Sequence, residues 1–273
     1  MRSGAAPMSR TLHTAALPLV SRRALVLGST LVGLAALLPG VAGSRLGAQP
    51  AADPHAARRA AMVEVIREDV VATSSYLGRS ALDARVLDAM GTVPRHRFVP
   101  AELVEHAYEN RPLAIGHGQT ISQPYIVAIM TDLLDLEPGD RALEVGTGSG
   151  YQAAVLAELV DSVYTMEIVP PLAERSAALL TELGYENVTT RLADGYHGWP
   201  EAAPFDAIVV TAAATHVPPP LVEQLAAPGR MILPVGSRFM VQQLVLVTKS
   251  ADGEITLDQL LPVRFVPLTG GHD

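Results

Sequence analysis

The amino-acid sequence predicts an α/β fold, in which helices cover both faces of a mostly parallel, twisted sheet. Three observations lead to this prediction. From residue 141 onward, short apolar segments alternate with segments of helical spacing. A glycine-rich turn follows the first apolar segment, and the last three apolar segments follow one another without a helix between them. Strands joined through helices run parallel, so the last three strands are expected to pair antiparallel at one edge of the sheet.

The glycine-rich turn is the centre of the predicted fold. Residues 142–145 predict a short buried strand, residues 146–150 contain three glycines, and residues 151–159 have helical spacing. Glycine permits positive φ and lets a ligand approach the backbone closely, and a helix N-terminus offers free N–H groups and partial positive charge. Strand, turn and helix together predict a cradle for a nucleotide-type cofactor. The alternative is a turn that serves only the packing of the strand against the helix.

The rest of the core follows from the same patterns. Strands are predicted over 163–168, 188–192, 205–211, 231–235, 243–248 and 255–266, and helices over 171–183 and 220–227. Ligands of such sheets bind beyond the carboxyl ends of the strands. Gly146, Glu167, Asp194 and Thr211 all fall at such ends and are expected to lie together.

A helical region is predicted ahead of the cradle, with helices over 56–72, 81–90, 101–108 and 126–134. Ser80 is the predicted N-cap of the second helix, and two prolines predict an extended segment over 93–100. Residues 111–125 are rich in glycine, proline, hydroxyls and amides, which predicts a loop. Its position just ahead of the cradle makes it a candidate substrate loop, the alternative being a solvated connector.

The residues at the strand ends favour S-adenosylmethionine over a dinucleotide. Residues 148–153 loosely fit the pattern G-x-G-x-x-A, and Glu167 lies about 20 residues on, where a ribose-binding acid is expected. Glu144, however, lies just ahead of the first glycine, where it would repel a pyrophosphate and suit a cationic ligand that carries an amino acid. Asp194 and Gly195 follow a third strand, where they can hold an adenine edge. Together these features resemble the S-adenosylmethionine site of Rossmann-like methyltransferases.

Composition and charge exclude several classes of function. The chain has 273 residues, 49% of them hydrophobic, and no cysteine, which excludes disulfides and cysteine nucleophiles. The eight histidines show no metal-binding spacing, so no metal is predicted. Residues 60–273 carry 13 basic and 27 acidic residues, which argues against a nucleic acid partner. The one lysine, Lys249, belongs to no Walker A motif.

The N-terminus is predicted to be separate from the catalytic body. Arg22 and Arg23 precede an uncharged, apolar run, so residues 1–48 resemble an export signal of the twin-arginine kind. Residues 49–59 are a predicted linker, and residues 60–273 the predicted methyltransferase domain, divided into 60–135 (helical region and substrate loop) and 136–273 (core). The alternatives are a membrane anchor or a start at Met62. No stable membrane insertion is expected after the signal is removed.

Five segments carry a resemblance to a known family. They read PLAIGHGQTISQPY from Pro112, LEVGTGSGYQA from Leu143, FDAIVVTAA from Phe205, LPVG from Leu233 and VRFVPL from Val263. These segments are similar to those of the protein-L-isoaspartate O-methyltransferases, in order and without large gaps from about residue 62 to residue 268. GQTIS and VRFVPL are more specific than the glycine loop. The first ~60 residues depart from the family, which is usually cytosolic and has no signal sequence.

The resemblance implies a Rossmann-like S-adenosylmethionine-dependent methyltransferase fold with an antiparallel edge and an N-terminal helical region. It implies methyl transfer to the α-carboxylate of an L-isoaspartyl residue, whose ester then collapses to a succinimide that partly reopens to normal aspartate. Ser122 matches the family's active-site serine, and Gln119, Thr120 and Ile121 lie beside it as substrate-binding residues. The implied cofactor-binding residues are Glu144, Gly146, Thr147, Gly148 and Gly150 at the methionine end, Glu167 at the ribose, Asp194 and Gly195 at the adenine, and Thr211 and Ala212 in the pocket wall.

The implied chemistry needs no general base, because a carboxylate is already ionised at neutral pH. Catalysis would come from positioning and from replacing the water around the carboxylate, and Ser122 suits this by donating a hydrogen bond. His117 is predicted as a hydrogen-bonded loop residue. The expected partners are isoaspartyl-containing peptides and proteins, and the expected state is a monomer.

Two other functions stay open at this point. One is a Rossmann methyltransferase that acts on a different carboxylate or small nucleophile. The other is an exported, non-catalytic binding module, because S-adenosylmethionine is made in the cytosol while the N-terminus resembles an export signal. Family resemblance predicts a cytoplasmic protein, and the signal-like segment makes a periplasmic or exported one the alternative.

Overall fold

The computed structural model describes residues 53–237 and 240–270, so the predicted export segment, residues 1–48, lies outside the described residues. Residues 51–273 form one compact unit. Its helical part contains α1 (Ala56–Ala72), α2 (Ser74–Leu77), α3 (Ala84–Thr92), the 3₁₀ turns η1 (Arg95–Phe98) and η2 (Ala101–His106), and α4 (Pro124–Leu133). Its core helices are α5 (Tyr151–Ala157), α6 (Pro170–Glu182) and α7 (Pro219–Gln224), with the 3₁₀ turns η3 (Gly195–His197) and η4 (Pro200–Ala202).

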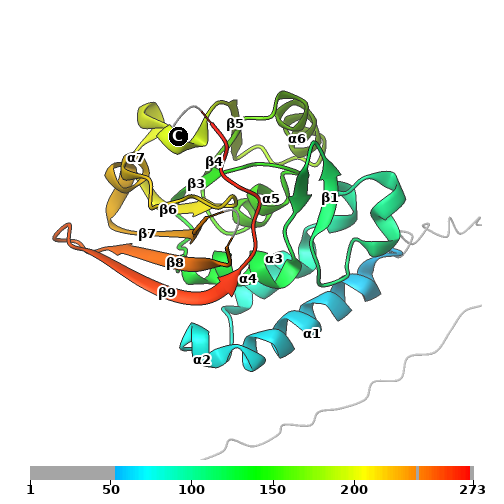
Figure 1. Cartoon of the computed structure of the whole chain (residues 1–273). Coiled ribbons are helices and arrows are strands. Elements are labelled where there is room, and N and C mark those ends of the chain that lie inside the picture. The colour runs from blue at the N-terminus through cyan, green and yellow to red at the C-terminus, as the bar shows by residue number, and fades with distance from the viewer. Residues whose placement is uncertain (1–52, 238–239, 271–273) are drawn as a thin grey trace, which may run out of the picture. The chain divides into compact units, whose positions relative to one another are not determined.

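A seven-stranded sheet forms the centre of this unit (Figure 1). Its strands are β3 (Arg141–Val145), β4 (Ser162–Glu167), β5 (Val188–Leu192), β6 (Phe205–Val210), β7 (Leu225–Val235), β8 (Gln242–Lys249) and β9 (Ile255–Val263), in the spatial order β5-β4-β3-β6-β7-β8-β9. The first five run parallel, whereas β7, β8 and β9 pair antiparallel with one another. The predicted fold class and antiparallel edge are confirmed.

Alternation along the strands gives the sheet two apolar faces. On β3, Ala142 belongs to the core formed with α1, α3, α4 and α5, while Leu143 and Val145 belong to the core formed with α7. Strands buried on both faces read as near-continuous apolar runs, as the parallel strands do here. Helix α5 packs on one of these two faces and begins directly after the glycine turn. The turn therefore lies at the carboxyl end of β3, where the chain passes onto that face.

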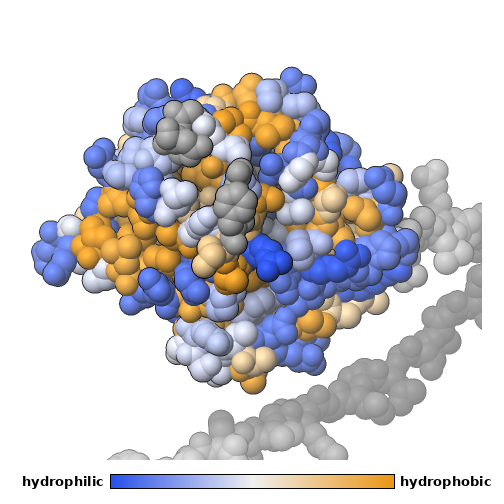
Figure 2. Space-filling model, in the orientation of Figure 1, coloured by the Kyte–Doolittle hydropathy of each residue, from blue (hydrophilic) through white to orange (hydrophobic). Residues whose placement is uncertain are grey.

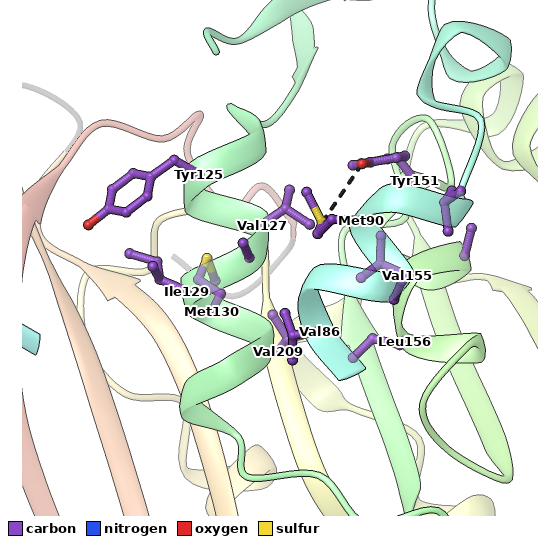
Figure 3. Packing of buried hydrophobic residues seen from close by; sticks show 14 of the residues in the cluster. Val86, Met90, Tyr125, Val127, Ile129, Met130, Tyr151, Val155, Leu156 and Val209 are labelled. Carbon is purple, nitrogen blue, oxygen red and sulfur yellow. Dashed lines mark hydrogen bonds between the residues drawn. The ribbon is translucent and has the colours of Figure 1, made fainter. Parts of the chain in front are cut away.

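The helical region is joined to the core by close packing (Figure 3). Met90 of α3 and Met130 of α4 are at most 1% exposed and lie with Val155 of α5 in one apolar cluster. The Tyr151 hydroxyl, at the start of α5, points to the Met90 sulfur at 3.8 Å. Because these helices share one core with the sheet, the region before the cradle belongs to the same folding unit as the cradle.

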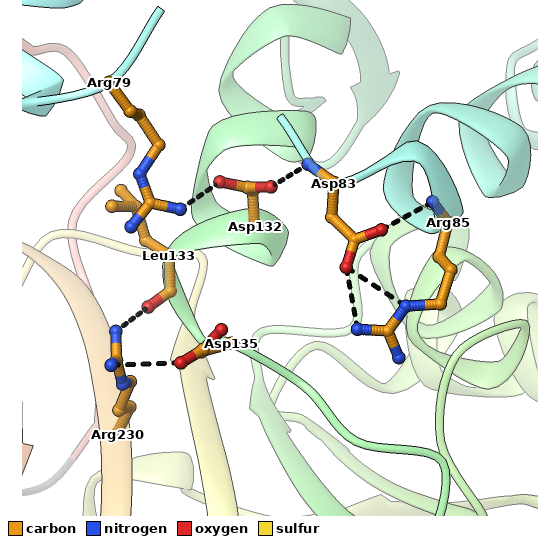
Figure 4. A network of polar contacts seen from close by, with 7 residues as sticks. All are labelled: Arg79, Asp83, Arg85, Asp132, Leu133, Asp135 and Arg230. Atoms are coloured by element: carbon orange, nitrogen blue, oxygen red, sulfur yellow. Dashed lines mark hydrogen bonds and ion pairs between the residues drawn. The ribbon is translucent and has the colours of Figure 1, made fainter. Parts of the chain in front are cut away.

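A polar network fixes the start of α3 (Figure 4), and here the sequence-based prediction of the cap was wrong. Asp83, and not Ser80, is the N-cap: its side chain accepts a hydrogen bond from the Arg85 N–H at 2.8 Å. The Asp83 N–H in turn donates to buried Asp132 of α4, which also pairs with Arg79. The contact with Asp132 favours Asp83 over Ser80 as the start of the helix, and it comes from a residue distant in sequence.

The predicted loop over 111–125 was also wrong. It holds an antiparallel hairpin of β1 (Leu113–Gly116) and β2 (Gln119–Ile121), followed by the start of α4. His117 and Gly118 at its tip have φ of 53° and 73°, as a two-residue hairpin turn with left-handed central residues requires. Leu113 and Ile115 are buried on one side of the hairpin. This alternation of buried residues is typical of a strand, but the glycine and proline content of the segment led to the prediction of a loop.

Two further predictions were wrong at their boundaries. Residues 93–100, expected to be extended, contain the 3₁₀ turn η1, in which the Arg97 N–H donates to the Pro94 carbonyl at 2.8 Å. The helix expected over 220–227 ends at Gln224, because Leu225 already pairs with Phe205 and begins β7. The end of the helix is set by pairing with a strand distant in sequence, whereas the turn is held by a local hydrogen bond that the proline pattern did not predict.

The surface seen in Figure 2 mixes polar and apolar residues, with apolar area gathered on the side of strands β7 to β9. Leu257 of β9 is 56% exposed there. Within the described residues, no helix combines the length and the apolar character that crossing a membrane requires.

Candidate functional site

The site lies in a cleft at the carboxyl ends of β3, β4 and β6. Its wall contains Gln119, Thr120, Ile121 and Ser122 of the hairpin, Glu144, Gly146, Thr147 and Gly148 after β3, Glu167 after β4, Gly195 after β5, and Thr211 and Ala212 after β6. Parallel strands bring these residues together because their carboxyl ends share one edge of the sheet. Twelve of the fourteen predicted site residues thus line one cleft.

Two glycines keep the floor of the cleft open. Gly146 has φ of 98°, and a Cβ there would lie 2.5 Å from the Thr211 hydroxyl oxygen, which donates to the Gly146 carbonyl. A Cβ on Gly195 would overlap the Val145 side chain. Glycine at these two turns therefore lets the backbone pack closely against Thr211 and Val145, and a larger residue would displace those side chains of the cleft wall.

The Glu167 carboxylate organises the glycine turn. One oxygen accepts the Gly148 N–H at 2.7 Å, and the other accepts the Ile168 and Val169 N–H groups at 2.9 Å each. Glu167 is 6% exposed and lies in the cleft wall. Its carboxylate therefore ties the turn after β3 to the end of β4 while facing the cleft.

Glu144 is a fully buried acid that lies beneath the cleft. It is 0% exposed, and its Oε2 accepts the Thr165 hydroxyl at 2.5 Å, behind which the Thr147 hydroxyl lies at 2.6 Å. Burial raises the pKa of Glu144 to about 8. Its Oε1 is also buried, and among the described residues none forms a hydrogen bond with it, so Glu144 lies beneath the floor of the cleft and keeps its proton at neutral pH.

The hairpin forms the opposite wall. Ile115 of β1 lies against Gly148, where a Cβ would come within 3.5 Å of its side chain. The Ile115 carbonyl accepts a hydrogen bond from Arg175 of α6 at 3.0 Å, and Figure 1 shows the hairpin beside α6. These contacts hold Gln119–Ser122 across the cleft from the glycine turn.

Gly150 and Asp194 are not in the cleft wall. Gly150 is the N-cap of α5 with φ of 89°, and a Cβ there would press on Leu180 at 3.3 Å. Asp194 caps η3, its side chain accepting the Tyr196 N–H at 3.0 Å. Gly150 thus serves helix packing in this structure, and Asp194 shapes the turn that carries Gly195.

Sequence reasoning missed several residues of the cleft wall. They are Tyr151 and Gln152 of α5, Ile168 and Val169 after β4, and Val266 to Thr269 after β9. Ile168 and Val169 directly follow Glu167, so an extension of the strand-end argument by two residues would have found them. The final segment reaches the cleft only because Leu268 pairs with Ala213.

A second, more open cavity lies beside the first, and Thr120, Ser122, Thr211 and Val266 line both. The rest of its wall is mostly apolar and includes Ile126, Pro262 and Phe265. Ser122 therefore lies at the boundary between the glycine-turn cleft and a second open space.

The cleft residues fit S-adenosylmethionine. The open glycine turn and the Glu167 carboxylate form a donor and acceptor set for a cationic ligand with an amino acid and a ribose. No group of three or more metal-binding side chains occurs in the part of the chain that the structure describes.

Comparison with known proteins identifies the family. The model of the family described as protein-L-isoaspartate(D-aspartate) O-methyltransferase matches residues 67–273. The chain belongs to this family. The match includes the hairpin, the whole sheet and every residue of the cleft wall.

Curated relatives agree with this assignment. The chain is 61% identical over 236 residues to protein-L-isoaspartate O-methyltransferase 2 of Syntrophobacter fumaroxidans, covering 86% of this chain and 95% of that one. It is 62% identical over 209 residues to the protein of the same name from a Polaromonas species, covering 77% and 99%.

Solved structures of the family share the fold. One, a protein-L-isoaspartate O-methyltransferase, has a TM-score of 0.68 at 28% identity and covers 78% of this chain and 66% of that one. Another, from Plasmodium falciparum and solved in complex with S-adenosyl-L-homocysteine, has a TM-score of 0.64 at 27% identity and covers 78% and 98%.

Proposed function

We propose that this chain transfers a methyl group from S-adenosylmethionine to the α-carboxylate of L-isoaspartyl residues in damaged peptides and proteins, which initiates their repair to L-aspartyl. The observation that carries the proposal is the position of Ser122. It lines both the cleft that contains the glycine turn and the adjoining, mostly apolar space. Membership of the family supports the same reaction.

Each wall of the cleft has a proposed role. Bound S-adenosylmethionine supplies an electrophilic methyl group on a positively charged sulfur. The glycine turn admits the methionine end, Glu144 lies buried beneath that turn, and Glu167 accepts hydrogen bonds from the ribose. Gly195 admits the adenine close to β3, and Thr211 and Ala212 complete the wall.

Ser122 is proposed to aim the acceptor carboxylate. Its hydroxyl donates a hydrogen bond and adds no charge, so the carboxylate keeps its nucleophilic electron pairs. Gln119, Thr120 and Ile121 close the hairpin side and exclude water, which strengthens electrostatic interactions within the cleft. Positioning thus replaces acid–base chemistry in this reaction.

The test is methyl transfer from labelled S-adenosylmethionine to one peptide made in two forms, isoaspartyl and normal aspartyl. Base-labile label on the isoaspartyl form alone is expected, because a methyl ester hydrolyses in base. Equal label on both forms would contradict the proposed specificity. Cofactor binding without transfer to either form would favour another methyl acceptor or a non-catalytic binding role.

A further inference from the structure

Arg95 is a charged side chain buried directly behind the substrate wall. It is 0% exposed. Its Nη2 donates to the Ser122 carbonyl at 2.7 Å, and its Nε donates to the Ala107 carbonyl at 2.8 Å. Its Nη1 is buried without a hydrogen-bond partner among the described residues. The guanidinium therefore fixes the backbone of Ser122 while part of its hydrogen-bonding capacity stays unused.

The charge of Arg95 has no acid to balance it. Within the described ranges no carboxylate lies at ion-pair distance from Arg95, and its neighbours are two carbonyls and the Tyr151 ring, whose centroid lies 4.7 Å from the guanidinium carbon. Burial lowers the pKa of Arg95 to about 10. An unbalanced buried charge opposes folding, and a negative group brought to the neighbouring cleft would offset part of this cost.

The position of Arg95 indicates which group that is. Ser122 and Tyr151, which contact the guanidinium, both line the cleft, and Ser122 also lines the adjoining cavity. A positive charge behind Ser122 lowers the electrostatic energy of a carboxylate brought to that residue. On the proposed function, the carboxylate that comes to Ser122 is the α-carboxylate of the isoaspartyl residue.

We infer that Arg95 is a positioning residue for the methyl acceptor: it holds Ser122 through the Ser122 carbonyl, and its buried charge attracts the substrate carboxylate to the hairpin wall. Arg95 acts through its hydrogen bond to the Ser122 carbonyl and through the electrostatic field of its positive charge. The inference rests on the proposed function and adds to it the source of charge that selects an ionised acceptor.

The test compares two peptides that differ by one charge, an isoaspartyl peptide and its α-carboxamide analogue. Their dissociation constants are measured calorimetrically with the full-length protein saturated with S-adenosyl-L-homocysteine. The wild type is expected to prefer the carboxylate form. Arg95→Met is expected to reduce this preference about tenfold, as the loss of one nearby charge does in a medium of intermediate dielectric constant, and Arg95→Lys is expected to keep most of it.

Arg97→Met is the matched control, because Arg97 lies in the same 3₁₀ turn as Arg95 but its side chain is exposed and pairs with Glu182. It is expected to leave the preference unchanged. If Arg95 had only a structural role, Arg95→Met would weaken the binding of both peptides equally. This result would overturn the inference. Weaker binding of S-adenosyl-L-homocysteine with an unchanged peptide preference would assign the charge to the cofactor's carboxylate and would also overturn it.

A thermal melt of each variant shows whether it still folds. If Arg95→Met does not fold, Arg95→Lys decides the question. Loss of the preference for the carboxylate peptide in this variant, which keeps the charge, would contradict the inference. Methyl transfer by the wild type tests the proposed function separately. Its absence would refute that function, whereas a change in peptide preference concerns Arg95 alone.

Discussion

At the scale of single residues, the site is defined by buried polar groups that face one cleft. Glu144 lies under the glycine turn with one oxygen bonded to Thr165, and Glu167 bonds three backbone N–H groups. Arg95 holds the opposite wall through Ser122. Polar groups buried in this way rigidify a site when they are satisfied and are costly when they are not, so their effects are measurable in stability as well as in catalysis.

Glu144 is expected to make the stability of the ligand-free protein depend on pH. Burial raises the pKa of Glu144 from 4.5 to about 8, so the native state keeps a proton that the unfolded chain loses. The stabilisation is complete below about pH 4.5 and is lost as the pH rises to 8, by at most about 1.4 kcal/mol per unit. Glu144→Gln has no such proton, so its free energy of unfolding relative to wild type should rise from pH 5 to pH 8.

Urea denaturation of wild type and Glu144→Gln at several pH values measures the difference between their free energies of unfolding. Titrations of the other groups contribute equally to both proteins and cancel in this difference. The difference should level off above pH 8. A constant difference across the range would show that Glu144 ionises at an ordinary pKa in the native protein.

Ser122→Ala is expected to lower turnover by about 10- to 100-fold, the effect of losing one hydrogen bond to a charged group. The affinity for S-adenosyl-L-homocysteine should stay within about twofold of wild type, since the proposed partner of the hydroxyl is the substrate. Ser250→Ala, in the turn after β8, is the control and should behave as wild type. Loss of cofactor affinity in Ser122→Ala would contradict the proposed role.

At the scale of elements, contacts between distant segments decide where helices and turns begin. The β1–β2 hairpin packs Ile115 against Gly148 and accepts a hydrogen bond from Arg175 of α6. Helix α3 begins where the Asp83 N–H meets Asp132 of α4 (Figure 4). Both elements take part in the site, one as its wall and the other as the support of α4 and α5 behind it.

Asp83→Ala is expected to lower the free energy of unfolding by about 1 kcal/mol, because it removes the side-chain cap of α3. Ser80→Ala, at the position that the sequence alone favoured, should change stability by less than about 0.5 kcal/mol. Urea denaturation of the two variants compares the positions directly. Equal losses would mean that Asp83 does not act as the cap in solution.

At the scale of the whole molecule, one compact unit from Ala51 to the C-terminus contains every residue of the cleft. Its first residues are tied to the body: Arg59 pairs with Asp53 and donates to the Gly91 carbonyl at 2.6 Å. Because one chain supplies the complete site, we propose that the monomer is the active form, which light scattering of the active protein measures.

A chain that starts at Ala51 is expected to melt within about 2 °C of the full-length protein and to bind S-adenosyl-L-homocysteine equally well, because it keeps the compact unit. A chain that starts at Met62 lacks Arg59 and the first turns of α1 and should melt several degrees lower. Scanning fluorimetry compares the three proteins. Equal melting of the two shortened chains would contradict the role given to residues 51–61.

The compartment stays a prediction, cytoplasmic by family and exported as the alternative. The 236 residues aligned with the Syntrophobacter protein exceed those from Ala51 to the end, so the similarity extends into the signal-like segment. The Polaromonas protein matches over 209 residues and 99% of its length. Cell fractionation with N-terminal sequencing decides between a cytoplasmic and an exported protein. A mature chain that starts near residue 44 to 49 and is found outside the cytoplasm would establish export.

Local sequence patterns were enough to predict the fold class, the antiparallel edge of the sheet and most of the cleft. Strand periodicity and the glycine turn are local signals, and the carboxyl ends of parallel strands must meet at one edge, so Gly146, Glu167 and Thr211 could be placed together without coordinates. The substrate segment was found through its resemblance to a family and not through its own pattern.

Only the tertiary structure decided the features that depend on contacts distant in sequence. The cap of α3 is Asp83 because Asp132 meets its N–H, residues 113–121 form a hairpin because Leu113 and Ile115 bury one side of it, and the burial of Glu144 sets its pKa. Arg95 lies behind Ser122 through a hydrogen bond that spans 27 residues. Burial and pairing across such separations are set by packing, which local propensity does not contain.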